Sequence, residues 1–366
     1  MTKEINRKQV KLERAAEVLK QRSEYAREFE VVSEPEKRSK DFNVMVPESL
    51  IYGYEYDKAL RLEKKLIQEF EGERLEKVIP GKVISNEYGG CYHIADESGI
   101  RFKKANYEKS RQLILLDLKL IPGIGPAREQ ALKQQGYETI EDLKKHPVWQ
   151  KAASEFLKLT DAKEVASLQS WLWRRLPKSH PLAHYLAGLC RDEDFAIVDI
   201  ETLGLFGRPI ILLGVAKPRK NKIYTSQFLL RNISDEVGAL WAFISDLEAG
   251  SSFITFNGRG FDIPFIKERL AYYGLEASLD NPHFDVLHFT RRALSGKLDN
   301  CRLETVEKYL DVHRDIDIPS ALVPEFYETY LRTRNVGPLV AIVKHNKQDL
   351  ITLASLFSKL YEEWNI

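Results

Sequence analysis

Four acidic residues in three separate segments have the types and positions that metal chemistry needs: Asp199 and Glu201 in FAIVDIETLGL, Asp262 in FITFNGRGFDIPFIKERL, and Asp349 in VAIVKHNKQDLITLASL. If the apolar run around Asp199 and Glu201 is a strand, both side chains leave the same face near its C-terminal end. Gathered carboxylates repel one another unless cations lie between them, and oxygen ligands favour Mg²⁺ or Mn²⁺. Two such ions about 3.5–4 Å apart can stabilise the attacking and the leaving oxygen of a phosphodiester.

The setting of Asp262 supports this interpretation. Asn257, two glycines and Phe261 follow the apolar run SSFITF and precede the helical pattern IPFIKERLAYYG, so Asp262 is expected at a strand-to-helix junction. A structural role is the alternative, because Asp is also a good helix N-cap and is common in turns after buried strands. Asn257 and Phe261 are expected to shape the site and touch nucleic acid, Phe261 by packing against a terminal base. Turn hydrogen bonding and core packing are their alternatives.

The three segments resemble the exonuclease motifs of the DEDD superfamily, the ribonuclease-H-like 3′–5′ exonucleases. The resemblance covers roughly residues 190–366. The metal ligands that it implies are Asp199, Glu201, Asp262 and Asp349. Members carry a Tyr four residues, or a His five residues, before the last Asp, whereas here His345 stands four residues before Asp349. One helical turn puts both on one face, so His345 is expected to reach the attacking water, as general base or as an orienting group. A solvated helix histidine is the alternative.

A longer stretch is similar to a narrower bacterial group, the YprB-like ribonuclease-H-like proteins; it includes FDVLHFTRRALSGKLDNCRLETVEKYL, RDIDIPSALVPEFYETYL and VKHN. The resemblance implies that HN-x-x-D is the usual form of the last motif there, so His345 is not interpreted as a lost site. Asp285, at the end of the apolar run HFD, is expected to be structural or to support the metal ligands from outside. Asp315 and Asp317, in a loop before Pro319, have no assigned role.

The elements that must position these residues follow from hydrophobic patterning after residue 195. The runs FAIVDIET, IILLGVAK and IYTSQFLL predict three strands with short connections. A helix from about Ser234, the strand SSFITF, a helix from Asp262, a strand near HFDVL and several helices follow. Strands that first succeed one another and then alternate with helices favour an α/β fold with a mixed sheet covered by helices. The resemblance implies its ribonuclease-H-like form.

A second segment, LDLKLIPGIGPAREQALKQQGYETIEDLKKHP, has features of phosphate binding. It predicts a helix, a Pro-Gly-Ile-Gly-Pro turn, a second helix, a stop at Gly136 and a new helix from about Thr139, and it resembles a helix-hairpin-helix motif. Gly123 and Gly125 let backbone approach a phosphate, and the following helix N-terminus offers unpaired N–H groups. Such contacts hold a nucleic-acid backbone without reading its bases, and salt weakens them.

Side chains around this turn add to the prediction. Arg128 and Lys133 are expected as accessory phosphate contacts, with a solvated helix face as the alternative for both. The motif also serves as plain packing between domains, and that interpretation stays open. An apolar stripe is expected along the motif from Leu120, Ile124, Ala127, Ala131 and Leu132.

The chain has 366 residues, enough for two or three domains. Residues 1–40 alternate basic and acidic side chains and predict a charged helical tail with a linker. Residues 41–110 predict a small α+β region, and residues 111–183 the helix-hairpin-helix helical domain. Residues 184–366 predict the ribonuclease-H-like exonuclease domain.

Composition is that of an intracellular enzyme. The formal net charge is +1, so any basic surface for nucleic acid must be local. The three cysteines, Cys91, Cys190 and Cys301, are far apart, which gives neither a disulfide framework nor metal-ligand spacing and fits a reducing compartment. The N-terminus lacks an apolar secretory core, and no run approaches the ~20 apolar residues of a membrane span. A cytoplasmic location without membrane contact is expected.

Together these features predict a 3′–5′ exonuclease that hydrolyses phosphodiester bonds of DNA or RNA with two Mg²⁺ or Mn²⁺ ions. Its predicted catalytic residues are Asp199, Glu201, Asp262, His345 and Asp349. One alternative is a non-catalytic nucleic-acid-binding or repair scaffold with an exonuclease-like fold. Another is a structure-specific endonuclease, which differs only in the position of the cut.

Overall fold

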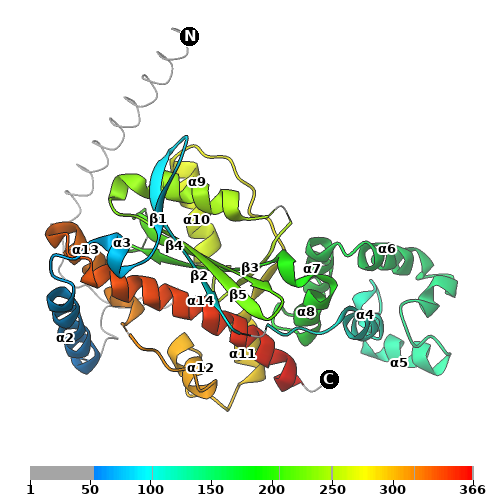
Figure 1. Ribbon diagram of the computed structural model, residues 1–366. Coiled ribbons are helices and arrows are strands. Elements are labelled where there is room, and N and C mark those ends of the chain that lie inside the picture. Colours follow the sequence, from blue (N-terminus) through cyan, green and yellow to red (C-terminus); the bar gives the residue numbers. More distant parts are fainter. Residues whose placement is uncertain (1–52, 101, 206, 249, 317, 365–366) are drawn as a thin grey trace, which may run out of the picture. The chain divides into compact units, whose positions relative to one another are not determined.

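The computed structural model describes residues 53–364 except residues 101, 206, 249 and 317. The charged tail predicted for residues 1–40 lies outside the described residues. The described chain falls in one compact unit, Ile51–Ile366 (Figure 1). Within it, no helix has both the length and the apolar character that crossing a bilayer requires.

A seven-stranded sheet forms the centre of the unit, with the strand order β1-β2-β5-β4-β3-β6-β7 (Figure 1). Its strands are β1 (Lys82–Asn86), β2 (Gly89–Ser98), β3 (Phe195–Thr202), β4 (Ile210–Arg219), β5 (Lys222–Leu229), β6 (Ser252–Thr255) and β7 (His283–Asp285). β3, β4 and β5 pair antiparallel, whereas β3, β6 and β7 run parallel. The predicted mixed sheet is therefore confirmed: short connections join the antiparallel strands, and helices separate the parallel ones.

Helices cover both faces of this sheet. α14 crosses one face in contact with β3, β4 and β5, while α9 and α10 lie on the other (Figure 1). The helices outside the segment 107–185 are α2 (Gly53–Glu69), α3 (Leu75–Val78), α9 (Glu236–Asp246), α10 (Asp262–Tyr272), α11 (Val286–Ala293), α12 (Leu303–Tyr309), α13 (Val323–Thr333) and α14 (Gly337–Trp364).

The alternation of side chains along β3 decides where its acidic pair points. Val198 and Ile200 belong to the core that contains the buried residues of α9 and α10. Ile197 belongs to the other core, which contains the C-terminal half of α14. Because successive strand residues face opposite sides, Asp199 and Glu201 leave the sheet on the side of α14.

The hairpin of β1 and β2 extends the sheet at one edge. β2 pairs antiparallel with β5, with Tyr92 opposite Leu229 and Ser98 opposite Ile223. Tyr92 is fully buried, and its hydroxyl donates to the carbonyl of Ile79 at 2.6 Å. The sequence indicated strands in this region but gave no sign that they complete the sheet of the later residues. The predicted domain boundaries stay predictions.

The chain between β2 and β3 is helical. Its helices are α4 (Tyr107–Leu115), α5 (Pro126–Gln134), α6 (Gln150–Asp161), α7 (Val165–Trp173) and α8 (Pro181–Tyr185). Buried residues of these helices, such as Ile114, Phe156 and Leu172, share a core with Ile197 of β3. A continuous hydrophobic core therefore joins this helical segment to the sheet.

The glycine-rich turn between α4 and α5 differs in detail from its prediction. Gly123 has a φ of 87°, and a short 3₁₀ helix precedes the turn. α5 ends where expected, because the N–H of Gly136 donates to Lys133 and that of Tyr137 to Leu132, both at 3.0 Å. The helix predicted from Thr139 is instead a 3₁₀ turn of four residues beginning at Asp142.

The apolar stripe predicted along this motif is only partly correct. Leu120, Ile124 and Leu132 are buried, but Ala127 and Ala131 are exposed. The large side chains supply the buried face, and the small ones leave the outer face of α5 open to solvent.

Candidate metal centre

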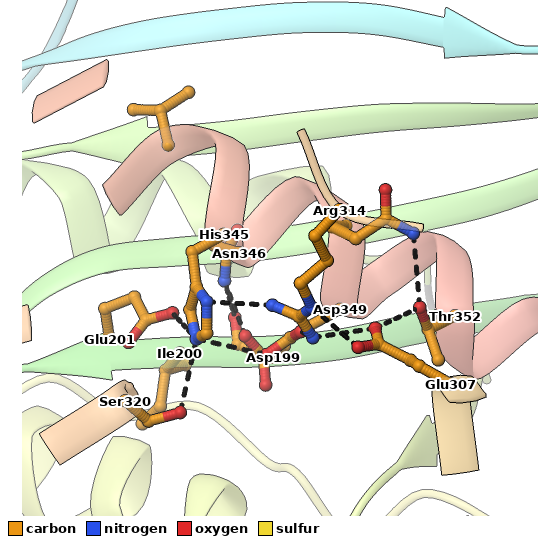
Figure 2. A network of polar contacts seen from close by, with 12 residues as sticks. Asp199, Ile200, Glu201, Glu307, Arg314, Ser320, His345, Asn346, Asp349 and Thr352 are labelled. Atoms are coloured by element: carbon orange, nitrogen blue, oxygen red, sulfur yellow. Dashed lines mark hydrogen bonds and ion pairs between the residues drawn. The ribbon is translucent and has the colours of Figure 1, made fainter. Parts of the chain in front are cut away.

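Side chains of β3 and α14 meet over the C-terminal end of β3 (Figure 2). Glu201, His345 and Asp349 each offer one ligand atom, and these atoms lie within 4.8 Å of one another. Nε2 of His345 lies 3.5 Å from Oδ2 of Asp349 and 3.9 Å from Oε1 of Glu201. The one-turn spacing on α14 brings the histidine and the aspartate together, and all three residues are buried.

Asp199 lies beside this group and is oriented by α14. Nδ2 of Asn346 donates to Oδ2 of Asp199 at 2.7 Å, while Oδ1 of Asn346 accepts from Nε2 of Gln227 at 2.8 Å. Gly214 on β4 makes room for this contact, since a Cβ there would lie 2.2 Å from Oδ1 of Asn346. One oxygen of Asp199 is thus held by an amide, and the amide is itself held by the sheet.

Asp262, at the start of α10, is another of the predicted metal ligands. It is the first residue of α10, and Phe261 occupies the N-cap position without a capping side-chain bond. Oδ1 of Asp262 accepts from the backbone N–H of Ile200 at 3.2 Å, between the two acidic residues of β3. The carboxylate is therefore tied to β3, and the N-cap interpretation does not describe it.

Burial and mutual repulsion raise the pKa values of these carboxyls. Burial is the largest cause for Asp199 and Glu201, whose pKa values lie well above the usual range, and the charge of Asp349 adds to both. Burial likewise raises the pKa of Asp262 to about 7, with further contributions from Asp285 and Asp349. A divalent cation would relieve this repulsion, so the residues present fit a hard metal ion.

A buried arginine, Arg314, also reaches this group (Figure 2). Its guanidinium donates to both carboxylate oxygens of Glu307, at 2.6 and 2.7 Å, and to Oδ1 of Asp349. Its Nη1 lies 2.8 Å from Nδ1 of His345. One oxygen of Asp349 is therefore already paired with a fixed positive charge.

The arginine determines the protonation pattern of His345. A guanidinium can only donate, so Nδ1 of His345 accepts and the ring proton is on Nε2. Nε2 points toward Glu201 and Asp349 and lies 3.2 Å from Oγ of Ser320. In this arrangement His345 can donate to a water or a phosphate oxygen, which favours the orienting role over the general base. Metal ligation through Nε2 would require Arg314 to leave Nδ1.

Asp285 shapes the loop before α10. Its Oδ1 accepts from the N–H of Asn257 at 2.8 Å, and its Oδ2 accepts from the N–H of Arg259 at 3.2 Å. Asn257 is exposed with a φ of 65°, and Phe261 packs on Phe265 with ring centroids 5.4 Å apart. The expected contact of Phe261 with a base stays a prediction.

The residues predicted to bind phosphate lie apart from this group, at the turn before α5. Gly123 is exposed and Gly125 partly so. Nη1 of Arg128 donates to the carbonyl of Gly123 at 2.5 Å, and Nζ of Lys133 lies 3.4 Å from a carboxylate oxygen of Glu129. The side chain of Arg128 thus binds the backbone of the glycine-rich turn that precedes its own helix. Phosphate binding by these residues stays a prediction.

Sequence reasoning missed the polar residues that orient the predicted ones. Gln227 is buried on β5, and a polar residue inside the apolar run IYTSQFLL was a usable signal. Asn346 directly follows His345, which was a second signal. Arg314 lies in a loop and Glu307 on a short helix, and neither has a periodic pattern that indicates burial.

The central mixed sheet with helices on both faces is consistent with a ribonuclease-H-like α/β fold. Residues 196–361 match a family model described as the RNase_H superfamily. The matched segment runs from β3 into α14, and it contains Asp199, Glu201, Asp262 and Asp349.

Comparison with a curated relative also supports a ribonuclease-H-like family. The chain is 33% identical over 192 residues to "Uncharacterized protein YprB" from Bacillus subtilis (strain 168). The alignment covers 51% of this chain and 46% of that protein, so the chain spans about half the length of the relative it matches. Both comparisons support a ribonuclease-H-like family. The exonuclease motifs and the helix-hairpin-helix motif remain predictions.

Proposed function

We propose that this protein is a divalent-metal-dependent nuclease that removes nucleotides from the 3′ end of DNA or RNA. The observation that carries the proposal is the convergence of buried carboxylates: Glu201 and Asp349 have oxygens within 4.8 Å of each other, and Nε2 of His345 lies beside both. Asp199 and Asp262 lie close enough to this group that the charges of Asp349 and Asp262 raise the pKa of Asp199, and the charge of Asp349 raises the pKa of Asp262. The match to the RNase_H superfamily suggests a nuclease and supports the proposal.

Each residue of the group would have a separate role in hydrolysis. A bound Mg²⁺ or Mn²⁺ ion would supply Lewis-acid chemistry at the phosphodiester and its attacking water. The residues that would hold it are Asp199, Glu201, Asp262 and Asp349. His345 would donate its Nε2 proton to orient the water or a phosphate oxygen, while Asn346 keeps Asp199 in place. The sequence predicts two ions, and Arg314 competes for one side of Asp349.

Removal of single carboxylates tests this function. Asp199→Asn and Asp262→Asn are expected to lower the rate of Mn²⁺-dependent degradation at least ~100-fold, because each metal contact is worth several kcal/mol in the transition state. The assay follows 5′-labelled single- and double-stranded DNA and RNA on gels. Glu276→Gln, which changes an exposed acid of the same domain, is the matched control and should leave the rate unchanged.

The products of the same assay decide between the candidate activities. A 3′–5′ exonuclease gives a ladder that shortens steadily, whereas an endonuclease gives defined internal fragments. Undiminished activity in both Asp variants would overturn the metal-centre assignment.

A second candidate, a non-catalytic nucleic-acid-binding protein, is favoured by one observation. Arg314 already pairs with Asp349, so the acidic group has an internal cation without any metal. A binder of this kind would retard oligonucleotides on native gels without shortening them, and Mn²⁺ would not change the result.

A further inference from the structure

A pocket of about 330 Å³ lies between α7 and the first turns of α10. Its lining includes Gln169 and Trp173 from α7, Arg259 from the loop before Asp262, Ile263 and Lys267 from α10, and His283 from β7. The four predicted metal ligands are not among the residues that line this pocket. The start of α10 contributes to both places, because Arg259 and Ile263 line the pocket and Asp262 belongs to the acidic group.

Arg259 is held at this pocket from two sides. Its backbone N–H donates to Oδ2 of Asp285 at 3.2 Å, which fixes the loop. Its guanidinium stacks on the ring of Trp173, with 3.9 Å between the guanidinium carbon and the ring centroid. Nζ of Lys178 lies 5.6 Å from the centroid of the same ring. Two positive charges are thus gathered around one aromatic side chain.

The guanidinium of Arg259 has no anion beside it. Within the part of the chain that the structure describes, no carboxylate oxygen lies within 4.0 Å of it. Arg269 and Arg314, the arginines with buried charges elsewhere, each form a two-pronged pair with a glutamate. Partial burial lowers the pKa of Arg259, and the more distant charge of Asp285 opposes this. Holding an unpaired guanidinium in such a place is costly unless an anion arrives from outside.

The ring on which Arg259 stacks also has an unpaired donor, although this atom is closed to solvent. Its Nε1 is buried and has no hydrogen-bond partner in the described structure. By contrast, Nε1 of Trp171 donates to the carbonyl of Leu120 at 2.8 Å, and Nε1 of Trp364 donates to Nδ1 of His184 at 2.9 Å. The lining also contains one carboxylate, that of Asp280, and Nζ of Lys267 lies 2.7 Å from it. The acid of the pocket is therefore paired with the lysine, and the guanidinium of Arg259 is left without an anion.

We propose that this pocket binds a phosphate group of a nucleic-acid strand, with the guanidinium of Arg259 as its principal contact. A phosphate supplies the negative charge and the acceptor oxygens that the guanidinium of Arg259 lacks, and arginine matches its geometry. The inference rests on the proposed nuclease function, because Arg259 stands three residues before Asp262 and would position the strand close to the acidic group. Such a contact reads no bases, so it serves DNA and RNA alike.

The test is the salt dependence of binding without metal. Fluorescence anisotropy measures the affinity for labelled single-stranded DNA and RNA in EDTA, where no hydrolysis occurs. Loss of one phosphate contact in Arg259→Gln should reduce the slope of log K against log salt by about 0.7. Arg174→Gln, which removes an exposed arginine from the end of α7, is the matched control and should leave the slope within error of wild type.

The outcomes distinguish a failure of the phosphate pocket from a failure of the proposed nuclease function. Normal binding by wild type with an unchanged slope in Arg259→Gln, or an equal loss in Arg174→Gln, would overturn the pocket alone. No binding of any oligonucleotide by wild type would overturn both. If Arg259→Gln does not fold, Arg259→Lys replaces it, because lysine keeps the positive charge but cannot stack as a planar group on Trp173. Weaker affinity with a retained slope in Arg259→Lys would support the pocket. Wild-type affinity in Arg259→Lys would refute the pocket.

Discussion

Arg314 and Arg269 each form a buried ion pair with a glutamate, but only Arg314 makes further contacts with the acidic group. Arg269, seven residues after Asp262 on α10, binds Glu236 at 2.8 and 2.6 Å. Arg314 binds Glu307 in the same two-pronged way and then extends to Asp349 and His345. Burial acts to lower the pKa of Arg314, but the glutamate and the aspartate raise it above its usual value, so the charge is permanent.

This difference predicts that Arg314 weakens metal binding. A fixed cation against Asp349 repels a divalent ion that shares the carboxylate, so Arg314→Gln should bind Mn²⁺ about tenfold more tightly, a change of ~1.4 kcal/mol. Isothermal titration calorimetry measures the affinity and the number of ions. Arg269→Gln is the control, because it breaks an equivalent pair away from the site. Weaker Mn²⁺ binding in Arg314→Gln would show instead that Arg314 orders Asp349 for the metal.

At the level of elements, the site depends on how closely α14 approaches β4. Asn346 of α14 fits over Gly214, and it connects Gln227 of β5 to Asp199 of β3. Gln227 also donates to the carbonyl of Val343 at 2.9 Å. The helix is therefore fixed to three neighbouring strands by one amide pair, and the register of α14 sets the position of His345 and Asp349.

A methyl group at Gly214 is expected to disturb this register. The added Cβ would lie 2.2 Å from Oδ1 and 2.9 Å from Cγ of Asn346, so the helix or the amide must move. Gly214→Ala should lower the free energy of unfolding by about 1–3 kcal/mol, as overpacked cores do. It should also weaken Mn²⁺ binding, because Asp199 loses its amide partner.

Chemical denaturation and calorimetry check both effects of Gly214→Ala. Gly99→Ala is the control, since a Cβ there meets no atom within 4 Å. Wild-type stability in Gly214→Ala would mean that α14 is not seated as closely as the contact requires.

The elements also show what the sequence could and could not predict. Apolar runs indicated β3 to β7, and the one-turn spacing of His345 and Asp349 indicated a shared helix face, because both are local patterns. Pairing of β2 with β5 unites Tyr92 with Leu229 across more than a hundred residues, and no local pattern reports it. Arg314 was missed for the same reason: its partners Glu307 and Asp349 are set by tertiary packing.

On the scale of the whole molecule, the segment 53–98 is built into the part of the chain that matches the RNase_H superfamily model. Nδ2 of Asn86 donates to the carbonyl of Gly238 on α9 at 2.8 Å. Nδ2 of Asn335, just before α14, donates to the carbonyl of Ile67 on α2 at 2.8 Å. These contacts fasten the segment to α9 and to Asn335 just before α14, and the β2–β5 pairing fastens it to the sheet.

Removal of this segment is therefore expected to expose the edge of the sheet. A chain that begins at Ile100 leaves β5 without its neighbour over the whole length that β2 now covers. Unpaired strand edges with apolar neighbours associate with one another, so this shortened chain should aggregate or elute as oligomers in size-exclusion chromatography. The matched control is a chain that begins at Gly53, which keeps every described strand. Monomeric behaviour and an unchanged melting temperature in the chain from Ile100 would show that the β1–β2 hairpin is an accessory, and that β3 to β7 with their helices are stable without it.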